Sequence, residues 1–300
     1  MAPPAIPLYL LPMNDLERRA LLGAAGVGAL AALAARSKGG PLNPPAGPVA
    51  PTGRTLDEVY NRIPDFAATQ LDGRTPIGQD GGQGGVTITA PGSYLLVRDI
   101  TSTGTTLHIS ANDVSIDLNG FTVTSTSTQP AAVIFLNGNR SRVRVRNGAV
   151  AGIGTGILTG SLSNGLVIEN VSFSGLRIGI GSTNVARGAL IRNCSFVDMG
   201  SGTTAADTAA TIAGIDITAI ASRIEECTVS RLFYNGTGTP AFHGIRATGA
   251  GNLVSRCLVT DDGAITGTGI LMSSSGTYRD NTVINFSTPY SGGVAGTGNL

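Results

Sequence analysis

The sequence has no tryptophan, only 5% aromatic residues and only 13% charged residues. Together with 43 glycines and 15 prolines in 300 residues, this composition does not describe an ordinary globular core, and it favours a repetitive β fold. Twenty basic and 19 acidic side chains leave a net charge of +1. Because nucleic acids and anionic membranes are bound by an excess of basic residues, neither is expected as a partner.

Cysteine and histidine are also scarce, with three and two copies. There is no Cys-x-x-Cys spacing, and His108 and His243 fall at different points of the repeat described below. A zinc site is therefore not expected, and the sequence predicts neither a metal nor a cofactor. What is abundant is Val, Ile and Leu interleaved with Ser, Thr and Asn, and 41% hydrophobic residues indicate a chain that folds.

The amino-terminal segment, residues 1–35, is typical of an export signal. Arg18 and Arg19 precede an uncharged run over residues 20–35, which is shorter than the roughly 20 residues of a membrane-spanning helix. The paired arginines resemble a twin-arginine signal, although Glu17 stands where such signals usually carry Ser or Thr. We expect a periplasmic or extracellular protein that leaves the membrane after signal cleavage; the alternative is a membrane anchor or a buried helix.

Two further segments separate this signal from the main repeat. Residues 36–53 contain five prolines and are expected to form a semi-rigid linker. Residues 54–85 begin with a capping-box pattern from Thr55 to Glu58, which predicts a short helix. Because the first coil of a solenoid exposes an apolar cross-section, we interpret residues 54–85 as an N-terminal helical cap.

From Val86 onward a short phrase recurs, with an aliphatic residue, a polar residue, usually Asn, then a small residue, a polar residue and Val or Phe. The clearest copies begin at Val145, Ile168, Ile191, Ile224 and Val254, with a weaker copy at Tyr278 and an irregular one at Leu118. The third residues of successive copies, 147, 170, 193, 226, 256 and 280, are 23, 23, 33, 30 and 24 residues apart. Such spacing predicts one supersecondary unit per copy, stacked as the coils of a solenoid.

Each coil is expected to contain three strands. The third residue of the phrase interrupts strict alternation, so two strands should meet there at a one-residue corner, where Asn tolerates the left-handed conformation. Another strand is predicted from a Gly-Ile pair upstream of each copy, at residues 156–157, 179–180, 214–215, 244–245 and 269–270. Stacked in register, such strands bury ladders of aliphatic side chains without helices.

The chain resembles the right-handed parallel β-helix proteins of the pectate-lyase-like superfamily, whose ladder of corner asparagines is matched by Asn147, Asn170 and Asn193. The resemblance covers about residues 86–290 and implies that residues 86–300 form a single all-β solenoid. It implies little about function, because lyases, hydrolases, epimerases, phage tailspikes and adhesins share this fold. A leucine-rich repeat is the main rival solenoid, but its Leu-x-x-Leu-x-Leu register is missing.

Cys194, Cys227 and Cys257 occupy one equivalent position in three successive coils. We expect them to stack inward as buried free thiols, since free Cys packs as a small apolar residue. The alternative is a disulfide between adjacent coils, which an exported protein could form, but an odd count leaves one thiol unpaired.

Two coils carry extra residues, roughly 199–213 and 234–242, which should project from one face as a binding region. Beside them, Asp216 and Arg246 each follow a Gly-Ile pair and should point outward from neighbouring coils, with His243 nearby. We predict these three as catalytic residues that could bind an acidic sugar and move a proton, with substrate-binding aromatics at Phe233, Tyr234 and Phe242. The structural alternative is an Asp216–Arg246 ion pair with a solvated histidine.

Residues Asp261, Asp262 and Gly263 invite comparison with calcium sites and with the acid pair of polygalacturonases. The polygalacturonase motifs are missing or out of order, since His243-Gly244 precedes the acid pair. Because calcium requires six or more oxygen ligands, a polar turn is the better interpretation of Asp261-Asp262-Gly263.

The sequence thus predicts an exported β-helix protein that binds, and at most also cleaves, an extracellular or envelope polysaccharide, in the manner of a lyase or hydrolase. The alternative is a noncatalytic structural or adhesive surface protein, and only convergence of titratable groups in one groove separates the two. A Ser/His/Asp hydrolase has little support, because no Gly-x-Ser-x-Gly motif occurs. The oligomeric state stays open.

Overall fold

A computed structural model describes residues 73–79, 85–127, 131–200, 211–234, 239–273 and 275–300. The chain divides into two units, residues 1–59 and 60–300, and all described residues belong to the second. The expected signal, the linker and the Thr55–Glu58 capping box lie outside the described residues. Among the described residues no helix is found that could cross a membrane.

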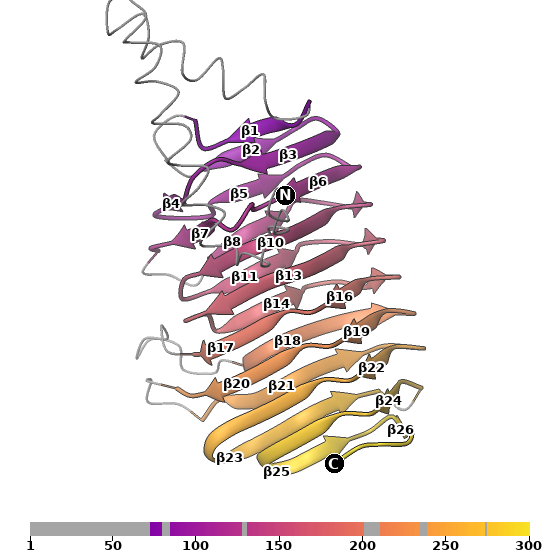
Figure 1. Cartoon of the computed structure of the whole chain (residues 1–300). Coiled ribbons are helices and arrows are strands. Elements are labelled where there is room, and N and C mark those ends of the chain that lie inside the picture. Colours follow the sequence, from indigo (N-terminus) through magenta and orange to yellow (C-terminus); the bar gives the residue numbers. More distant parts are fainter. Residues whose placement is uncertain (1–72, 80–84, 128–130, 201–210, 235–238, 274) are drawn as a thin grey trace, which may run out of the picture. The chain divides into compact units, whose positions relative to one another are not determined.

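The described residues are all-β, and their strands form a β-solenoid in which each strand pairs in parallel with strands of the neighbouring coils (Figure 1). In the described part of the expected helical cap there is no helix. It contains instead β1 (Thr75–Ile77), which pairs with β3 (Gly92–Leu96). The parallel pairing thus begins before Val86.

The strands fall into three long ladders, each of which receives one strand or half-strand per coil. Ladder 1 continues from β1 and β3 through β6 (Val114–Asp117), the first half of β10 (Arg144–Ala151), the first half of β13 (Val167–Ser174), β16 (Leu190–Arg192), β19 (Arg223–Glu225), β22 (Leu253–Ser255), β24 (Thr277–Arg279) and β26 (Val294–Ala295). Ladder 2 contains β4 (Ile100–Ser102), β7 (Thr122–Ser125), the second halves of β10 and β13, β17 (Ser195–Met199), β20 (Thr228–Leu232) and the first parts of β23 (Leu258–Met272) and β25 (Thr282–Ser291).

Ladder 3 contains β2 (Val86–Ile88), β5 (Leu107–Ile109), β8 (Ala132–Leu136), β11 (Thr155–Thr159), β14 (Ile178–Ser182), β18 (Thr211–Ile220), β21 (Ala241–Thr248) and the later parts of β23 and β25. A short fourth ladder links β9 (Arg140–Ser141), β12 (Ser163–Asn164), β15 (Ala186–Arg187) and the end of β18. The three strands expected per coil are therefore present, and the fourth ladder is an addition that the repeat did not predict.

The predicted register of the repeat is confirmed on ladder 1. Val145 pairs with Ile168, Ile168 with Ile191 and Ile191 with Ile224, and this column continues to Val254 and Tyr278. The third residues of the copies all have left-handed backbone conformations: Asn147, Asn170, Asn193, Glu226, Arg256 and Asp280, with φ between 51° and 60°. The corner thus requires the left-handed backbone conformation, whereas the residue type at the corner can vary.

The asparagine corners also bond to one another. Asn170 Nδ2 donates to Asn147 Oδ1 at 3.1 Å, and Asn193 Nδ2 donates to Asn170 Oδ1 at 2.8 Å. Where the asparagines end, Arg256 donates to Glu226 Oε1 at 2.9 Å and replaces the amide contact with an ion pair. Side-chain contacts thus join three pairs of neighbouring corners and help to hold those coils in register.

The glycines of the Gly-Ile phrase make room for side chains of ladder 2. A Cβ atom on Gly179 would lie 2.3 Å from the Phe196 ring and 2.6 Å from the Gly214 carbonyl oxygen. Gly244 and Gly269 are equally crowded by valines of ladder 2. Since real Cβ atoms do not approach so closely, the glycine column is a packing requirement of the interior.

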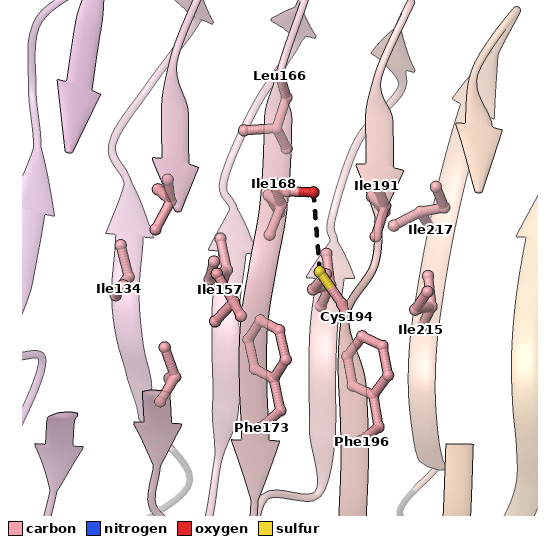
Figure 2. Packing of buried hydrophobic residues seen from close by; sticks show 14 of the residues in the cluster. Ile134, Ile157, Leu166, Ile168, Phe173, Ile191, Cys194, Phe196, Ile215 and Ile217 are labelled. Atoms are coloured by element: carbon pink, nitrogen blue, oxygen red, sulfur yellow. Dashed lines mark hydrogen bonds between the residues drawn. The ribbon is translucent and has the colours of Figure 1, made fainter. Parts of the chain in front are cut away.

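The interior is a stack of aliphatic columns that includes one pair of stacked aromatic rings. Phe173 and Phe196 are fully buried and their rings stack in parallel, with centroids 4.8 Å apart. Figure 2 shows this pair beside the isoleucine columns that include Ile168 and Ile191. Val229 and Val259 occupy the equivalent positions in the following coils.

Cys194, Cys227 and Cys257 are free thiols that lie in this interior, each 1–2% exposed. Their sulfur atoms contact backbone carbonyl oxygens, as Cys194 does with Ile168 at 3.7 Å (Figure 2). Hydrogen bonding with Cys194 and Cys257, together with burial, holds the pKa of the Cys227 thiol well above its usual value. These contacts favour the protonated thiol at Cys227. The same hydrogen bonds lower the pKa of Cys194 and of Cys257, against the effect of burial.

Charged side chains alternate in sign along the outward face of ladder 1. Asp117, Arg146, Glu169, Arg192 and Glu225 are successive partners in register on neighbouring strands. Arg146 Nη2 lies 3.2 Å from Asp117 Oδ2, and Arg192 Nη2 lies 3.3 Å from Glu169 Oε1. Alternation therefore places unlike charges on adjacent coils.

Candidate functional site

The predicted catalytic residues lie on two neighbouring strands of ladder 3, β18 and β21. Ile215 and Ile245 are fully buried partners in register, so the residues that follow them, Asp216 and Arg246, face outward side by side. The outward placement expected from the Gly-Ile phrase is therefore found.

Asp216 and Arg246 form a bidentate ion pair. Arg246 Nε donates to Asp216 Oδ1 at 2.5 Å, and Nη2 donates to Oδ2 at 2.9 Å. The Asp216 side chain is 12% exposed, whereas Arg246 is 38% exposed. The arrangement is the ion pair weighed above as the structural alternative, and it leaves part of the guanidinium accessible while both carboxylate oxygens are occupied.

His243 lies on the same strand as Arg246, three residues earlier, and its Cα partners are Ala213 and Thr268. Its Nδ1 atom is buried and has no hydrogen-bond partner among the described residues. Burial lowers the pKa of His243 below its usual value of 6.5, and the positive charge of Arg246 lowers it further, although Asp216 acts in the opposite direction. The imidazole is therefore neutral near pH 7 and can accept a proton.

The three predicted substrate-binding aromatics are placed differently from one another. Phe233 directly follows β20 and is 37% exposed. Tyr234 and Phe242 are half-buried and pack against the hydrophobic core. Phe233 is thus the aromatic of this set that offers a large apolar surface to solvent, and most of the two expected insertions (201–210 and 235–238) lies outside the described residues.

Asp261 binds the backbone of its own and the neighbouring coil. Its carboxylate accepts hydrogen bonds from Leu232 N at 2.9 Å and Gly263 N at 3.0 Å. Asp261 and Asp262 lie within β23, where the pairing with β25 shifts register, so the expected polar turn is an irregularity inside a strand. Within the described ranges no group of three or more His, Cys, Asp or Glu side chains could hold a metal ion.

Two features of this face were not predicted from the sequence. Thr218 and Thr248, two residues beyond Asp216 and Arg246, place their Oγ1 atoms 3.1 Å apart. Further along ladder 3, His108 and Phe135 are partners in register whose rings meet edge-on, 6.1 Å between centroids. Thr218 and Thr248 each lie three residues after the isoleucine of a Gly-Ile pair, and they have the same 30-residue spacing as Ile215 and Ile245. This spacing could have predicted that the threonines are neighbours.

The fold and this face are the grounds for a functional assignment. No protein-family model matches the chain, and a search of curated proteins finds no match either.

Proposed function

We propose that this chain is an exported right-handed parallel β-helix protein, of the pectate-lyase-like kind, that binds an extracellular or envelope polysaccharide on the outward face of ladder 3. One observation carries the proposal: Asp216 and Arg246 share the outward face of ladder 3 with the Thr218–Thr248 hydroxyl pair, and His243 lies on β21 three residues before Arg246. Charged, hydroxyl and imidazole groups lie there within two adjacent coils.

The chemistry of these groups suits an acidic sugar. The guanidinium of Arg246 is held rigidly by Asp216 and keeps an exposed edge that can donate to a carboxylate. Thr218 and Thr248 can donate to and accept from sugar hydroxyls. Gly181 and Leu271 hold the equivalent positions on the flanking coils, so a polymer that lies along the stack meets the charged pair where it crosses β18 and β21.

A catalytic version of the proposal assigns a role to each residue. The neutral imidazole of His243 would take the proton from the carbon next to the sugar carboxylate, and Arg246 would hold that carboxylate while its negative charge builds up. A carbon–carbon double bond would then form as the bond from the neighbouring carbon to the glycosidic oxygen breaks, and the departing oxygen would take a proton from water. Asp216 would fix the guanidinium. Since Asp216 accepts two hydrogen bonds from Arg246, we do not assign it the base.

A noncatalytic structural or adhesive role is the second candidate, and a specific observation favours it. Equivalent ion pairs occur on other faces, between Arg231 and Asp198 at 2.7 Å and between Arg142 and Asp113 at 2.5 to 2.7 Å. Ion pairing between coils is therefore a general device of this solenoid, and such pairs need no ligand.

The decisive experiment is a binding and turnover screen on acidic and neutral polysaccharides, following unsaturated products and reducing ends. We expect retention by an acidic polysaccharide, with a large loss in Arg246→Ala and little change in Arg231→Ala, which removes an ion pair elsewhere. Turnover that disappears in His243→Gln would support the catalytic version. Binding unaffected by Arg246→Ala would remove this site, and binding without turnover would favour the adhesive role.

A further inference from the structure

The outward side of ladder 2 differs in composition from that of ladder 1. Its residues flank the buried column that contains Val150, Phe173, Phe196 and Val229, and so they form two parallel outward columns. The first column is Thr122, Ala149, Ser172, Ser195, Thr228, Leu258 and Thr282, and the second is Thr101, Thr124, Ala151, Ser174, Val197, Ser230, Thr260 and Ile284. We call these 15 positions the hydroxyl face.

Ten of the 15 side chains carry a hydroxyl group, and none is charged or aromatic. Ladder 1 differs, because one of its two outward columns holds alternating acids and arginines such as Glu169 and Arg192. Charges near ladder 2 lie at its corners, as in the Asp198–Arg231 pair. A ligand of this face is therefore uncharged, since a charged ligand would lose its hydration without gaining an opposite charge.

The hydroxyl groups are available for binding. Ser195 Oγ donates to Ser172 Oγ at 3.0 Å, and the structure gives the side-chain hydroxyls of the other eight residues no partner among the described residues. The backbone beneath them is bound to the coils on either side, and the central column is fully buried. The groups are thus presented on a rigid sheet, so little conformational entropy is lost on binding.

The face is periodic in two directions. Neighbouring strands repeat about every 4.8 Å along the stack, and the two columns are separated by two residues of one strand, about 6.6 Å. A rigid partner that contacts the whole face must have matching repeats in both directions. A soluble sugar chain repeats in one direction only, and sugar rings usually stack on aromatic side chains, which this face does not have.

We propose that the hydroxyl face binds the surface of ice. Ice presents an uncharged lattice of water oxygen atoms whose repeats are of the same size as these two spacings, and each oxygen can donate or accept a hydrogen bond. The hydroxyls of Thr and Ser can take places in that lattice, while the methyl groups of Thr, Ala and Val fill the spaces between them. The inference concerns ladder 2 and does not depend on the polysaccharide proposal for ladder 3.

The test is incorporation of the purified chain into slowly grown ice, together with thermal hysteresis of its solution. The variants are Ser195→Arg and Thr228→Arg, which place a long charge at the centre of the face. The matched control is Thr87→Arg, which makes the same change at an exposed threonine of ladder 3. Circular dichroism and thermal melting check that all three variants fold.

We expect the wild-type chain and Thr87→Arg to enter the ice and to show hysteresis. Ser195→Arg and Thr228→Arg should be excluded from ice as completely as a protein with no affinity for it. Exclusion of the wild-type chain, or equal incorporation of all variants, would overturn the proposal. Retention on crystalline cellulose or chitin without entry into ice would also overturn it and would assign the face to a polymer lattice.

Discussion

At the scale of single residues, the corners of the coils depend on a backbone conformation that most side chains disfavour. Asn147, Asn170 and Asn193 adopt it and also bond to one another through their side-chain amides. The same conformation recurs at a second corner, where Asp113, Arg142 and Ala221 hold it without a shared side-chain chemistry. The first corner was predictable because its residue type repeats, and the second was not because its residue types vary.

Substitution of Asn170 separates these two contributions. Asn170→Ala loses both the amide bonds and the tolerance for a φ of 54°, so we expect a loss of about 1–2 kcal/mol in the free energy of unfolding. Asn170→Gly keeps the conformation accessible and should lose less. Urea unfolding measures both, with Ser174→Ala as an exposed control in the same strand. Equal losses in the Ala and Gly variants would contradict a role for the left-handed conformation.

His243 links the candidate site to pH. Because its pKa in the folded chain lies below the usual 6.5, the unfolded chain binds the proton more readily. The contribution of neutral His243 to the free energy of unfolding is therefore fully present above about pH 6.5. It falls as the pH drops toward the folded-state pKa and does not change further below that pKa.

We expect His243→Gln to abolish this part of the acid-dependent loss. Urea unfolding at pH 7.5 and pH 5.5 gives the comparison. Between these two pH values, wild type should lose more free energy of unfolding than His243→Gln. If both proteins lose the same free energy between the two pH values, burial of His243 has no effect on its protonation.

At the scale of strands and ladders, packing between ladders 2 and 3 explains why glycine recurs before isoleucine. Gly179 lies against Phe196, so Gly179→Ala forces a Cβ into the ring and into the Gly214 carbonyl. We expect a loss of about 1–3 kcal/mol, the usual range for overpacking. Gly104→Ala is the control, because nothing lies within 4 Å of its Cβ position. Similar unfolding midpoints for the two variants would show that the interior adjusts freely.

At the scale of strands and ladders, the register between strands was the feature most easily predicted from the sequence. The repeated phrase aligned Val145, Ile168 and Ile191 correctly because each coil must return its aliphatic residue to the same column. The same arithmetic placed Asp216 beside Arg246. It could not give the burial of Tyr234 and Phe242 against the core or the lowered pKa of His243, because these depend on which side chains surround each residue, and the repeat does not specify them.

At the scale of the whole described solenoid, each coil contacts chiefly its two neighbours, so coils should be removable in whole units. Deletion of residues 167–189 joins Leu166 to Leu190 and should leave a folded, less stable chain, because Val167 and Leu190 are equivalent in register. Deletion of residues 167–178 removes only part of a coil and should prevent cooperative folding. Circular dichroism and urea unfolding distinguish these outcomes.

The one-coil deletion also tests the alternating charges. It would place Arg192 next to Arg146, whereas in the intact chain Arg192 pairs with Glu169. Arg192→Gln should therefore stabilise the deletion variant by about 0.2–1 kcal/mol, the usual range for a cross-strand pair. In the intact chain the same substitution should stabilise nothing. A gain in both chains would mean that the charges act independently of their neighbours.

The parallel ladders have a mechanical consequence. Because each strand is bonded to strands one coil away, a force applied to the two ends of the solenoid should detach coils one after another from an end. Each detached coil of 23 to 33 residues would lengthen the chain by about 80 to 115 Å. Single-molecule extension should therefore record a series of small, unequal steps, whose order of lengths follows the spacing of the corner residues along the sequence.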